Sequence, residues 1–185
     1  MNMKKNIALL AFATLLAVPA FAETKVVKTT TTTTTEDAHT VSRSDQVEWS
    51  GDFGLGTVAS KFHFGVGVKA QVPVTFDNND FKFGLRSGFY LGPSDPTDFI
   101  IPVLATAEYD FRVSGNLKPY VGIEMGLSVT HSSGADGFNG NTSTDFAFLF
   151  VPGVNFGEGE RYFFEIPLGT LASDFAFLPS IGMHF

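Results

Sequence analysis

From Val47 to the end of the chain, apolar residues recur at every second position, and most of the large ones are phenylalanines. The clearest run consists of Phe62, Phe64, Val66, Val68, Ala70, Val72, Val74 and Phe76. The chain has 21 phenylalanines, and after residue 22 all of them except Phe138 and Phe163 lie on the apolar side of such a run. A period of two residues indicates β-strands that each have one apolar face.

Eight runs of this kind follow one another, and most approach the roughly 9–11 residues that a tilted membrane-spanning strand needs. They cover Val47–Leu55, Phe62–Phe76, Phe81–Leu91, Phe99–Phe111, Leu117–Val129, Phe146–Phe156, Tyr162–Leu168 and Phe175–Phe185. Tight connections of Gly, Asn and Asp type alternate with longer ones. The tight ones are Asp77–Asp80, Val113–Asn116 and Gly157–Glu160, and the longer ones are Gly92–Asp98 and the polar loop His131–Asp145.

The opposite face of these runs carries charges and many glycines, which are Gly65, Gly67, Gly84, Gly88, Gly122, Gly126, Gly153, Gly169 and Gly182. An eight-stranded barrel has room inside only for tightly fitted side chains. Glycines fit such a lumen, whereas a wall of phenylalanine rings has to point outward, into lipid. The alternative, a soluble ligand-carrying barrel of the lipocalin kind, would have to place all these rings in one void. The pattern predicts an all-β fold, an eight-stranded antiparallel up-and-down transmembrane β-barrel.

The first 46 residues differ from the rest of the chain. Residues 1–22 are predicted to be a secretory signal peptide, with two lysines, an apolar run and the cleavage site Ala20-Phe21-Ala22. Residues 23–46 contain Thr29–Thr35 and little that could be buried, which predicts a disordered, Thr-rich periplasmic tail. Threonine favours strands, so part of this tail could instead pair with the barrel. Residues 47–185 are predicted to form the outer-membrane β-barrel.

Charge and composition exclude several kinds of function. Removal of the signal peptide takes two of the 12 basic residues and none of the 19 acidic ones, so the remaining chain is strongly acidic. This disfavours nucleic acid as a partner, because nucleic acid needs basic patches. The chain has no cysteine and therefore no disulfide or thiolate metal site. Its histidines show no metal-ligand spacing, and no phosphate-binding loop is present, so we predict no metal and no cofactor.

The predicted signal peptide, the eight alternating strands, the alternation of short and long connections and the terminal Phe185 resemble the small outer-membrane barrels of the OmpA and OmpX type. Bacterial outer-membrane barrels have short turns in the periplasm and longer loops outside, so an even number of strands predicts both termini in the periplasm. We also predict a monomer in the cell outer membrane that contacts outer-membrane lipid and lipopolysaccharide. In that family the barrel-assembly machinery reads a last strand that ends in an aromatic residue. This implies the same role for Phe177, Ile181 and Phe185, although Met183 stands where the signal often has another aromatic residue.

Charged residues on the glycine-bearing faces of five different runs are the main candidates for a site. They are Lys69, Arg86, Glu108, Glu124 and Glu165. Counted from the tight connections, all of them fall in the lower or middle part of the barrel. Buried charges are costly unless they are paired, so we expect a network of salt bridges across the lumen, as small barrels of this family also carry. The network predicts a plugged lumen, and a gated ion pathway is the alternative.

Prolines inside the runs are the main local conflict with a strand prediction, because proline removes a ladder hydrogen bond. Bulges and strand ends would account for them. Pro152, Pro167 and Pro179, however, fall at similar heights on the last three runs. They predict a possible lateral gate for a lipid-like ligand, as in the lipid A palmitoyltransferase family.

Enzymes are known on this scaffold, and the lipid A deacylase family carries His-x-Ser on a late strand that faces lipid. This chain has His131-Ser132-Ser133 at the edge of the long loop, and its seventh run contains no histidine. We therefore predict no catalytic residues and a structural or surface-interaction role. The alternatives are a narrow channel or lateral gate for small hydrophobic solutes and, second, a lipid A-modifying enzyme.

Overall fold

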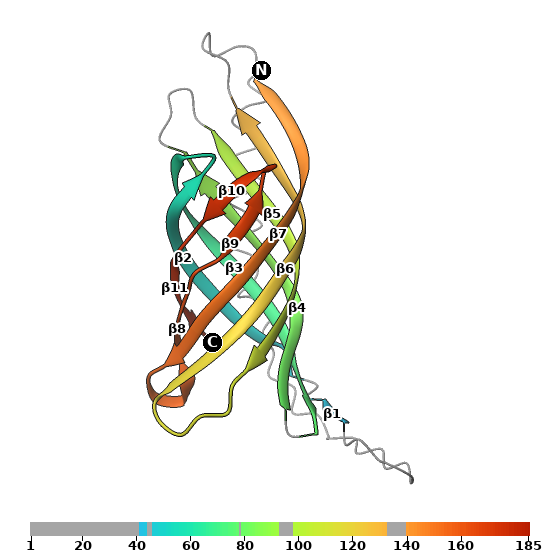
Figure 1. The fold of residues 1–185 in the computed structure, drawn as a ribbon, viewed down its shortest axis with the longest axis vertical. Coiled ribbons are helices and arrows are strands. Elements are labelled where there is room, and N and C mark those ends of the chain that lie inside the picture. Colours follow the sequence, from blue (N-terminus) through green and yellow to red (C-terminus); the bar gives the residue numbers. More distant parts are fainter. Residues whose placement is uncertain (1–40, 44–45, 78, 93–97, 133–139) are drawn as a thin grey trace.

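The computed structural model describes residues 41–43, 46–77, 79–92, 98–132 and 140–185, which are nearly all strand (Figure 1). The predicted signal peptide and most of the predicted tail lie outside these residues. The strands are β1 (Val41–Arg43), β2 (Glu48–Val58), β3 (Lys61–Phe76), β4 (Asn79–Leu91), β5 (Phe99–Asp110), β6 (Leu117–Ser132), β7 (Asn141–Phe156), β8 (Tyr162–Glu165), β9 (Leu168–Leu171), β10 (Asp174–Phe177) and β11 (Ser180–His184), with the 3₁₀ turn η2 (Glu158–Glu160) after β7.

The strands from β2 to β11 form a closed ring of eight positions. β2 to β7 pair in sequence order, each antiparallel to the next. β8 and β9 share the seventh position beside β7, and β10 and β11 share the eighth. The ring closes where Ile181 of β11 and Phe177 of β10 lie opposite Phe53 and Thr57 of β2. The predicted eight-stranded antiparallel up-and-down barrel is confirmed.

The two ends of the barrel differ in their connections. The turn end, at the bottom of Figure 1, carries β1, the last residue Phe185 and the connections at 77–78, 111–116 and 157–161. The opposite loop end carries the ends of β4 and β6, the starts of β5 and β7, and two hairpins of only two residues, Ala59-Ser60 and Ala172-Ser173. All four of these hairpin residues have positive φ angles. That backbone matches the twist of the flanking strands, although Asn-Gly is its usual sequence.

Two boundaries differ from the sequence prediction. β6 and β7 continue into the region predicted as a polar loop, with His131 opposite Thr142. Polar residues on both faces hid this extension, because the period of two could not be read from hydrophobicity. β1 lies in the predicted tail and pairs with residues 74–76 of β3. It pairs with the part of β3 beyond Gln71, where the pairing of β3 with β2 ends. The end of the predicted tail therefore pairs with the barrel, which is the alternative that its threonines allowed.

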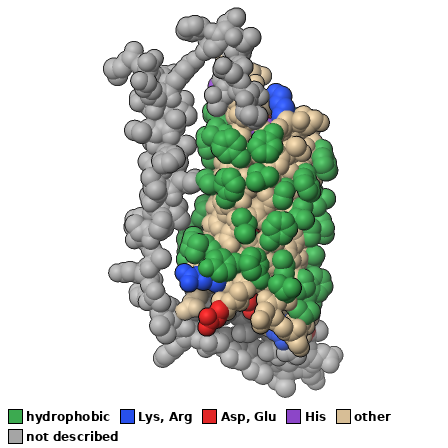
Figure 2. Space-filling model, turned by 90° about the vertical axis from the view of Figure 1, so that its left-hand side faces the viewer, with side chains coloured by type: hydrophobic (Ala, Val, Ile, Leu, Met, Phe, Trp, Pro, Cys, Tyr) green, Lys and Arg blue, Asp and Glu red, His purple; other side chains and the backbone are tan. Residues whose placement is uncertain are grey.

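The phenylalanine face of every strand points out of the barrel. Thirteen of these rings are exposed, from 38 % at Phe76 to 75 % at Phe185, and the other four, Phe81, Phe89, Phe99 and Phe156, are half-buried. Phe163, which is off the pattern, points inward and is buried. Figure 2 shows hydrophobic side chains over the middle of one face, with acidic and basic side chains near its lower edge. No helix in the described part of the chain is long and apolar enough to cross a membrane.

Glycines on the inner face leave room for the large side chains of the lumen. A Cβ atom on Gly153 would overlap the ring of Tyr120, and one on Gly182 would overlap the ring of Phe163. A Cβ on Gly67 would lie 2.5 Å from Oδ2 of Asp52. The inner glycines are therefore required by close approach, as the volume argument from the sequence anticipated.

We expect Gly153→Ala to destabilise the barrel by about 1–3 kcal/mol, because the added methyl group meets a ring that is fixed inside the lumen. Urea unfolding in detergent micelles measures the change. Gly51→Ala is the matched control, since Gly51 lies on the outer face and the nearest atom to its added Cβ belongs to the terminal Phe185 ring, at 3.2 Å. Equal losses for the two variants would show that lumen packing is not the cause.

Candidate functional site: the barrel lumen

Side chains fill the inside of the barrel in three layers, which follow one another along each strand. Going up β2 from the turn end, the inward residues are Glu48 at the mouth, Asp52 in a polar network and Val58 in an apolar cluster. β5 runs the other way and passes through the same layers, ending with Glu108 in the network and Asp110 at the mouth. The middle layer is the candidate site that the sequence predicted.

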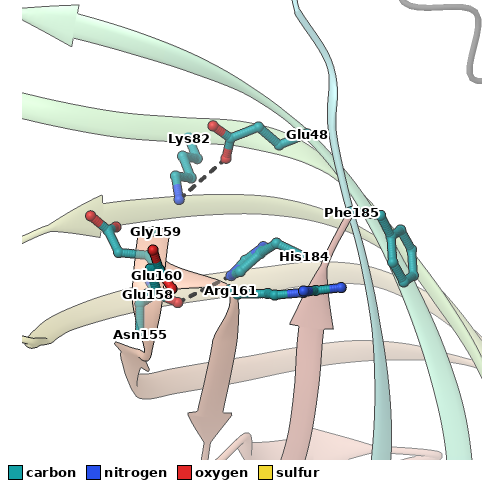
Figure 3. Close-up of a pocket in the computed structure, with 9 residues that line it drawn as sticks. All are labelled: Glu48, Lys82, Asn155, Glu158, Gly159, Glu160, Arg161, His184 and Phe185. Carbon is teal, nitrogen blue, oxygen red and sulfur yellow. Dashed lines mark hydrogen bonds and ion pairs between the residues drawn. The ribbon is translucent and has the colours of Figure 1, made fainter.

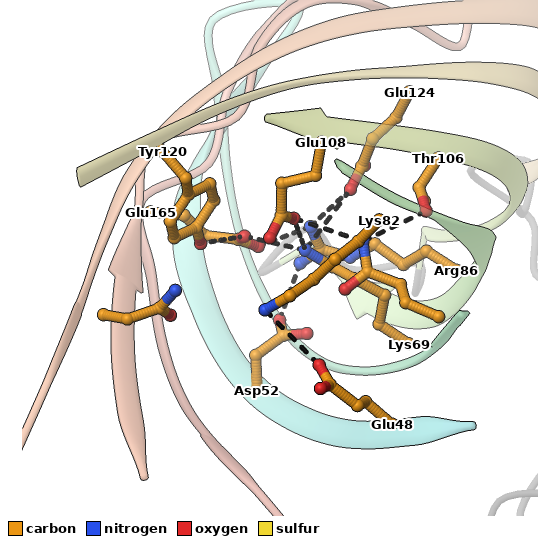
Figure 4. Close-up of polar contacts among 12 residues, drawn as sticks. Glu48, Asp52, Lys69, Lys82, Arg86, Thr106, Glu108, Tyr120, Glu124 and Glu165 are labelled. Carbon is orange, nitrogen blue, oxygen red and sulfur yellow. Dashed lines mark hydrogen bonds and ion pairs between the residues drawn. The ribbon is translucent and has the colours of Figure 1, made fainter. Parts of the chain in front are cut away.

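The structure brings the five predicted charged residues into one network (Figure 4). Nζ of Lys69 lies 3.3 Å from Oε2 of Glu108 and 3.1 Å from Oε2 of Glu165. Nη1 of Arg86 lies 3.1 Å from Oε1 of Glu124 and also donates to Glu165. None of these five side chains is more than 5 % exposed. The network therefore joins five barrel strands through buried ion pairs inside the lumen.

Glu165 is the hub of the network, because its two oxygens accept hydrogen bonds from four strands. Arg86 of β4 and Ser180 of β11 donate to Oε1, the latter at 3.2 Å. Lys69 of β3 and Tyr120 of β6 donate to Oε2, the latter at 2.9 Å. Every bond is charge-assisted, which makes it stronger than a bond between neutral groups.

Sequence reasoning missed several members of the network. Asp52 is one, and its Oδ1 accepts a 2.9 Å hydrogen bond from Nη2 of Arg86. Gln71 is another, since its amide donates to Glu108 at 3.2 Å and to Thr106 at 3.4 Å. The alternation was a sufficient signal for both: Asp52 precedes the outward Phe53, so it had to point inward.

An apolar cluster fills the lumen between the network and the loop end, and the sequence analysis did not predict it. The cluster contains Val58, Tyr90, Ile100, Leu104, Ala147, Leu149, Val151, Leu171, Ala176 and Leu178. Its strands are apolar on both faces, as in Phe99–Leu104, so the inner residues could not be told from the outer ones by hydrophobicity. The lumen therefore contains a buried apolar layer as well as a charged one.

Polar contacts at the loop end tie the connections to the wall. Oδ1 of Asp98 accepts a 2.8 Å hydrogen bond from Ser132 of β6, and Oδ2 lies 3.3 Å from Nζ of Lys61 in β3. The Ser128 hydroxyl of β6 accepts a 3.1 Å bond from the backbone N–H of Ala172 in the β9–β10 turn. These contacts hold two of the loop-end connections next to the apolar cluster.

A cavity of about 520 Å³ opens at the turn end (Figure 3). Its lining includes the polar side chains of Glu48, Lys82, Asn155, Arg161 and His184 as well as the ring of Phe185. Lys82 is engaged on both sides, with Nζ 3.3 Å from Oε2 of Glu48 and 3.2 Å from Oδ2 of Asp110. The lumen is thus hollow near the turn end and filled further up.

Asp80 and Arg112 form an ion pair at the rim of the turn end, outside the lumen. The guanidinium donates to the two carboxylate oxygens at 2.6 and 2.7 Å. These hydrogen bonds hold the pKa of Asp80 below its ordinary value. Its side chain is more than a third exposed, so the pair contributes little to stability.

The residues predicted as an assembly signal lie apart from the lumen. Phe177, Ile181 and Phe185 all point outward from the last barrel position and are exposed. Phe177 belongs to β10 and Ile181 to β11, so a break in the strand separates them.

The three prolines predicted as a lateral gate lie next to one another across the wall. The carbonyl oxygen of Pro152 accepts from Ile166 N at 2.9 Å, and that of Pro167 accepts from Leu178 N at 2.9 Å. The Pro179 carbonyl accepts from Leu55 N at 3.0 Å. Proline has no N–H with which to return the bond, so each contact lacks the second bond of an ordinary antiparallel pair. The breaks between β8 and β9 and between β10 and β11 occur at these positions.

The residues of the candidate histidine–serine motif point in different directions. The His131 ring stacks on Phe99, and its Nδ1 lies 2.9 Å from Oγ1 of Thr142. Ser132 points to the other side of the strand, toward Asp98, and Ser133 lies outside the described residues. Within the described ranges, no three His, Cys, Asp or Glu side chains are placed to hold a metal ion.

No protein-family model matches this chain, and no curated protein matches it. Solved structures do. Neisserial surface protein A, NspA, is 15 % identical with a TM-score of 0.53, and the match covers 75 % of this chain and 94 % of NspA. The outer membrane enzyme PagL is 12 % identical with a TM-score of 0.53, over 74 % of this chain and 98 % of PagL.

A third structure is that of Ail, the attachment invasion locus protein of Yersinia pestis, which is 14 % identical with a TM-score of 0.50, over 75 % of this chain and 97 % of Ail. At sequence identities this low, the matches show a shared fold. Together with the ring of eight strands, they show that the chain has the fold of the small eight-stranded outer-membrane β-barrels of the OmpA and OmpX type.

Proposed function

We propose that this chain is an integral outer-membrane β-barrel with a plugged lumen and a non-enzymatic role, structural or in surface interaction. One observation carries the proposal: large apolar side chains cover the outside while the charges are buried inside. Water would penalise each exposed apolar ring, because exposed apolar surface costs about 25 cal/mol per Å². A contiguous apolar belt of this size is stable only against lipid.

Clusters of aromatic rings near both ends support a membrane-spanning position. At the turn end, Phe81 contacts Phe76 and Tyr109 with ring centroids 5.7 and 5.1 Å apart. At the loop end, Phe99 contacts Phe89 and His131 at 5.7 and 5.1 Å. Aromatic girdles mark the two interfaces of an outer-membrane barrel, and short turns face the periplasm. The turn end, with both ends of the barrel domain, is then periplasmic.

The partners that fit this position are outer-membrane lipid and lipopolysaccharide around the wall and the barrel-assembly machinery during insertion. The exposed stripe of Phe177, Ile181 and Phe185 is the segment that we propose the machinery recognises. We propose a monomer, because the ring closes on itself and its paired strands leave no long open edge.

Conductance in a planar lipid bilayer tests the plug directly. We expect the purified wild-type protein to insert without opening a measurable channel, because the charged and apolar layers block the lumen in series. A barrel with both layers opened should conduct, so the matched comparison changes Leu104 and Leu149 of the apolar layer and Arg86 and Glu165 of the charged layer to alanine. Steady unitary currents from the wild type would show that the lumen is an open pore and would contradict the plug.

A lateral gate is the second candidate function, and the three proline contacts favour it. At each of these prolines the two neighbouring strands share one hydrogen bond instead of two. These weakened contacts lie side by side in the wall, next to the inward residues Val151 and Leu178 of the apolar cluster. We expect amide hydrogen exchange to be faster in β8 and β9 than in the centre of β3, whose ladders to β2 and β4 are continuous. Exchange equally slow in both regions would remove the case for a side path.

Catalysis is the least supported of the alternatives. PagL is an outer membrane enzyme, so the fold accommodates chemistry, but His131 and Ser132 point to opposite sides of their strand here. Incubation with lipid A followed by mass spectrometry tests this part of the proposal: we expect no release of an acyl chain.

A further inference from the structure

The buried network contains more acidic than basic groups. Its carboxylates are Asp52, Glu108, Glu124 and Glu165, and its basic groups are Lys69 and Arg86. If all were ionised, two negative charges would have no counter-charge. Lys82, the next basic group toward the turn end, does not supply one, because Glu48 and Asp110 already engage it.

The available donors are distributed unevenly over the four carboxylates. Glu165 accepts four hydrogen bonds, and Oε2 of Glu108 accepts from Lys69 and Gln71. Asp52 and Glu124 each accept from Arg86 through one oxygen. Their second oxygens, Oδ2 of Asp52 and Oε2 of Glu124, are buried and have no hydrogen-bond partner among the described residues. The surplus charge thus falls on these two side chains.

The surroundings of the two acids offer no other compensation. Asp52 faces Lys69 on β3, Arg86 and Tyr90 on β4 and Glu165 on β8, while its partners across the neighbouring strands are Gly67 and Gly182. Glu124 faces the same two basic groups and Glu165, while its partners across the neighbouring strands are Thr106 and the apolar Leu149. An ionised carboxylate with an unpartnered oxygen at such a place costs several kcal/mol, whereas a neutral carboxyl group costs far less.

From this geometry we propose that the network is a proton-binding site, which takes up two protons when the barrel folds and keeps them on Asp52 and Glu124 at neutral pH. Glu108 and Glu165 stay ionised and pair with Lys69 and Arg86. The lumen is then electrically neutral without any further ion.

Infrared spectroscopy of the folded barrel in lipid tests the proposal, because a protonated carboxyl group has a carbonyl stretch that a carboxylate lacks. At pH 7 we expect this band in the wild type, about half of it in Asp52→Asn and in Glu124→Gln, and all of it in the control Glu48→Gln, whose carboxylate lies outside the network and leaves its charge balance unchanged. Absence of the band from the wild type overturns the proposal without any variant. A band that neither Asp52→Asn nor Glu124→Gln reduces also overturns it.

The pH dependence of unfolding is an independent test. Above the ordinary pKa of about 4, the unfolded chain has released both protons. The unfolding constant should therefore rise about tenfold per pH unit for each proton that only the folded barrel holds. Asp52→Asn can hold only one of the two protons, so its unfolding constant should rise about tenfold per pH unit, where that of the wild type rises about a hundredfold. The same slope in both proteins, or stability that depends on NaCl rather than on pH, would assign the counter-charge to a cation and contradict the proposal.

Discussion

Arg86→Ala is expected to lower the free energy of unfolding by about 3–5 kcal/mol, because removing one partner of a buried ion pair leaves the other charge uncompensated. Arg86 donates to Asp52 at 2.9 Å, to Glu124 at 3.1 Å and to Glu165. Lys69 would remain as the one basic group that the structure places among the four carboxylates. Urea unfolding in lipid vesicles, followed by tryptophan fluorescence or gel mobility, measures the loss.

Arg112→Ala is the matched control for this prediction. Its ion pair with Asp80 has shorter contacts than those of Arg86 with Asp52 and Glu124, but the arginine side chain is 52 % exposed. Surface pairs of this kind contribute little to stability, because water and salt screen them. Similar losses for the two variants would show that burial does not set the cost. If Arg86→Ala left stability unchanged and raised conductance, the network would be a gate and not a plug.

The order and number of the strands could be predicted because outside and inside differ strongly in chemistry. Along β3, every outward residue from Phe62 to Phe76 is apolar, while the inward residues include Gly65, Gly67 and Lys69. The alternation of apolar and small or charged residues therefore predicted both the position of the strand and the face that points outward. Phe163, which does not lie on the apolar side of its run, points into the lumen, where its buried ring lies against Gly182.

The remaining features depend on contacts between strands that one run of sequence does not reveal. The apolar cluster was missed because Ile100 and Leu104 alternate with residues that are equally apolar. The hub role of Glu165 depends on Ser180 and Tyr120, which reach it from two other strands. The breaks at Pro167 and Pro179 depend on which neighbouring carbonyls compensate for the missing N–H groups. The sequence was therefore sufficient to predict the strands and the direction of their side chains. It was not sufficient to predict which side chains from different strands meet in the lumen.

Phe148→Arg is expected to destabilise the folded barrel by about 2–4 kcal/mol in lipid, because it places a charge on the lipid-facing wall near the bilayer midplane. Phe148 lies in the middle of β7, points outward and is 39 % exposed. A soluble protein would tolerate arginine at such a surface position, so the substitution distinguishes a lipid-facing wall from a water-facing one. Equilibrium unfolding in phospholipid vesicles measures the difference.

Phe62→Arg provides the control, since Phe62 is similarly exposed but lies at the start of β3 beside the two-residue hairpin of the loop end. Near the interface an arginine costs about 0–1 kcal/mol, because its long side chain reaches the headgroups and water. The effect should therefore depend on depth and not on the loss of a phenylalanine. Equal effects at both depths, or a mid-wall arginine that leaves the barrel stable and soluble without detergent, would mean that the phenylalanine face does not contact acyl chains.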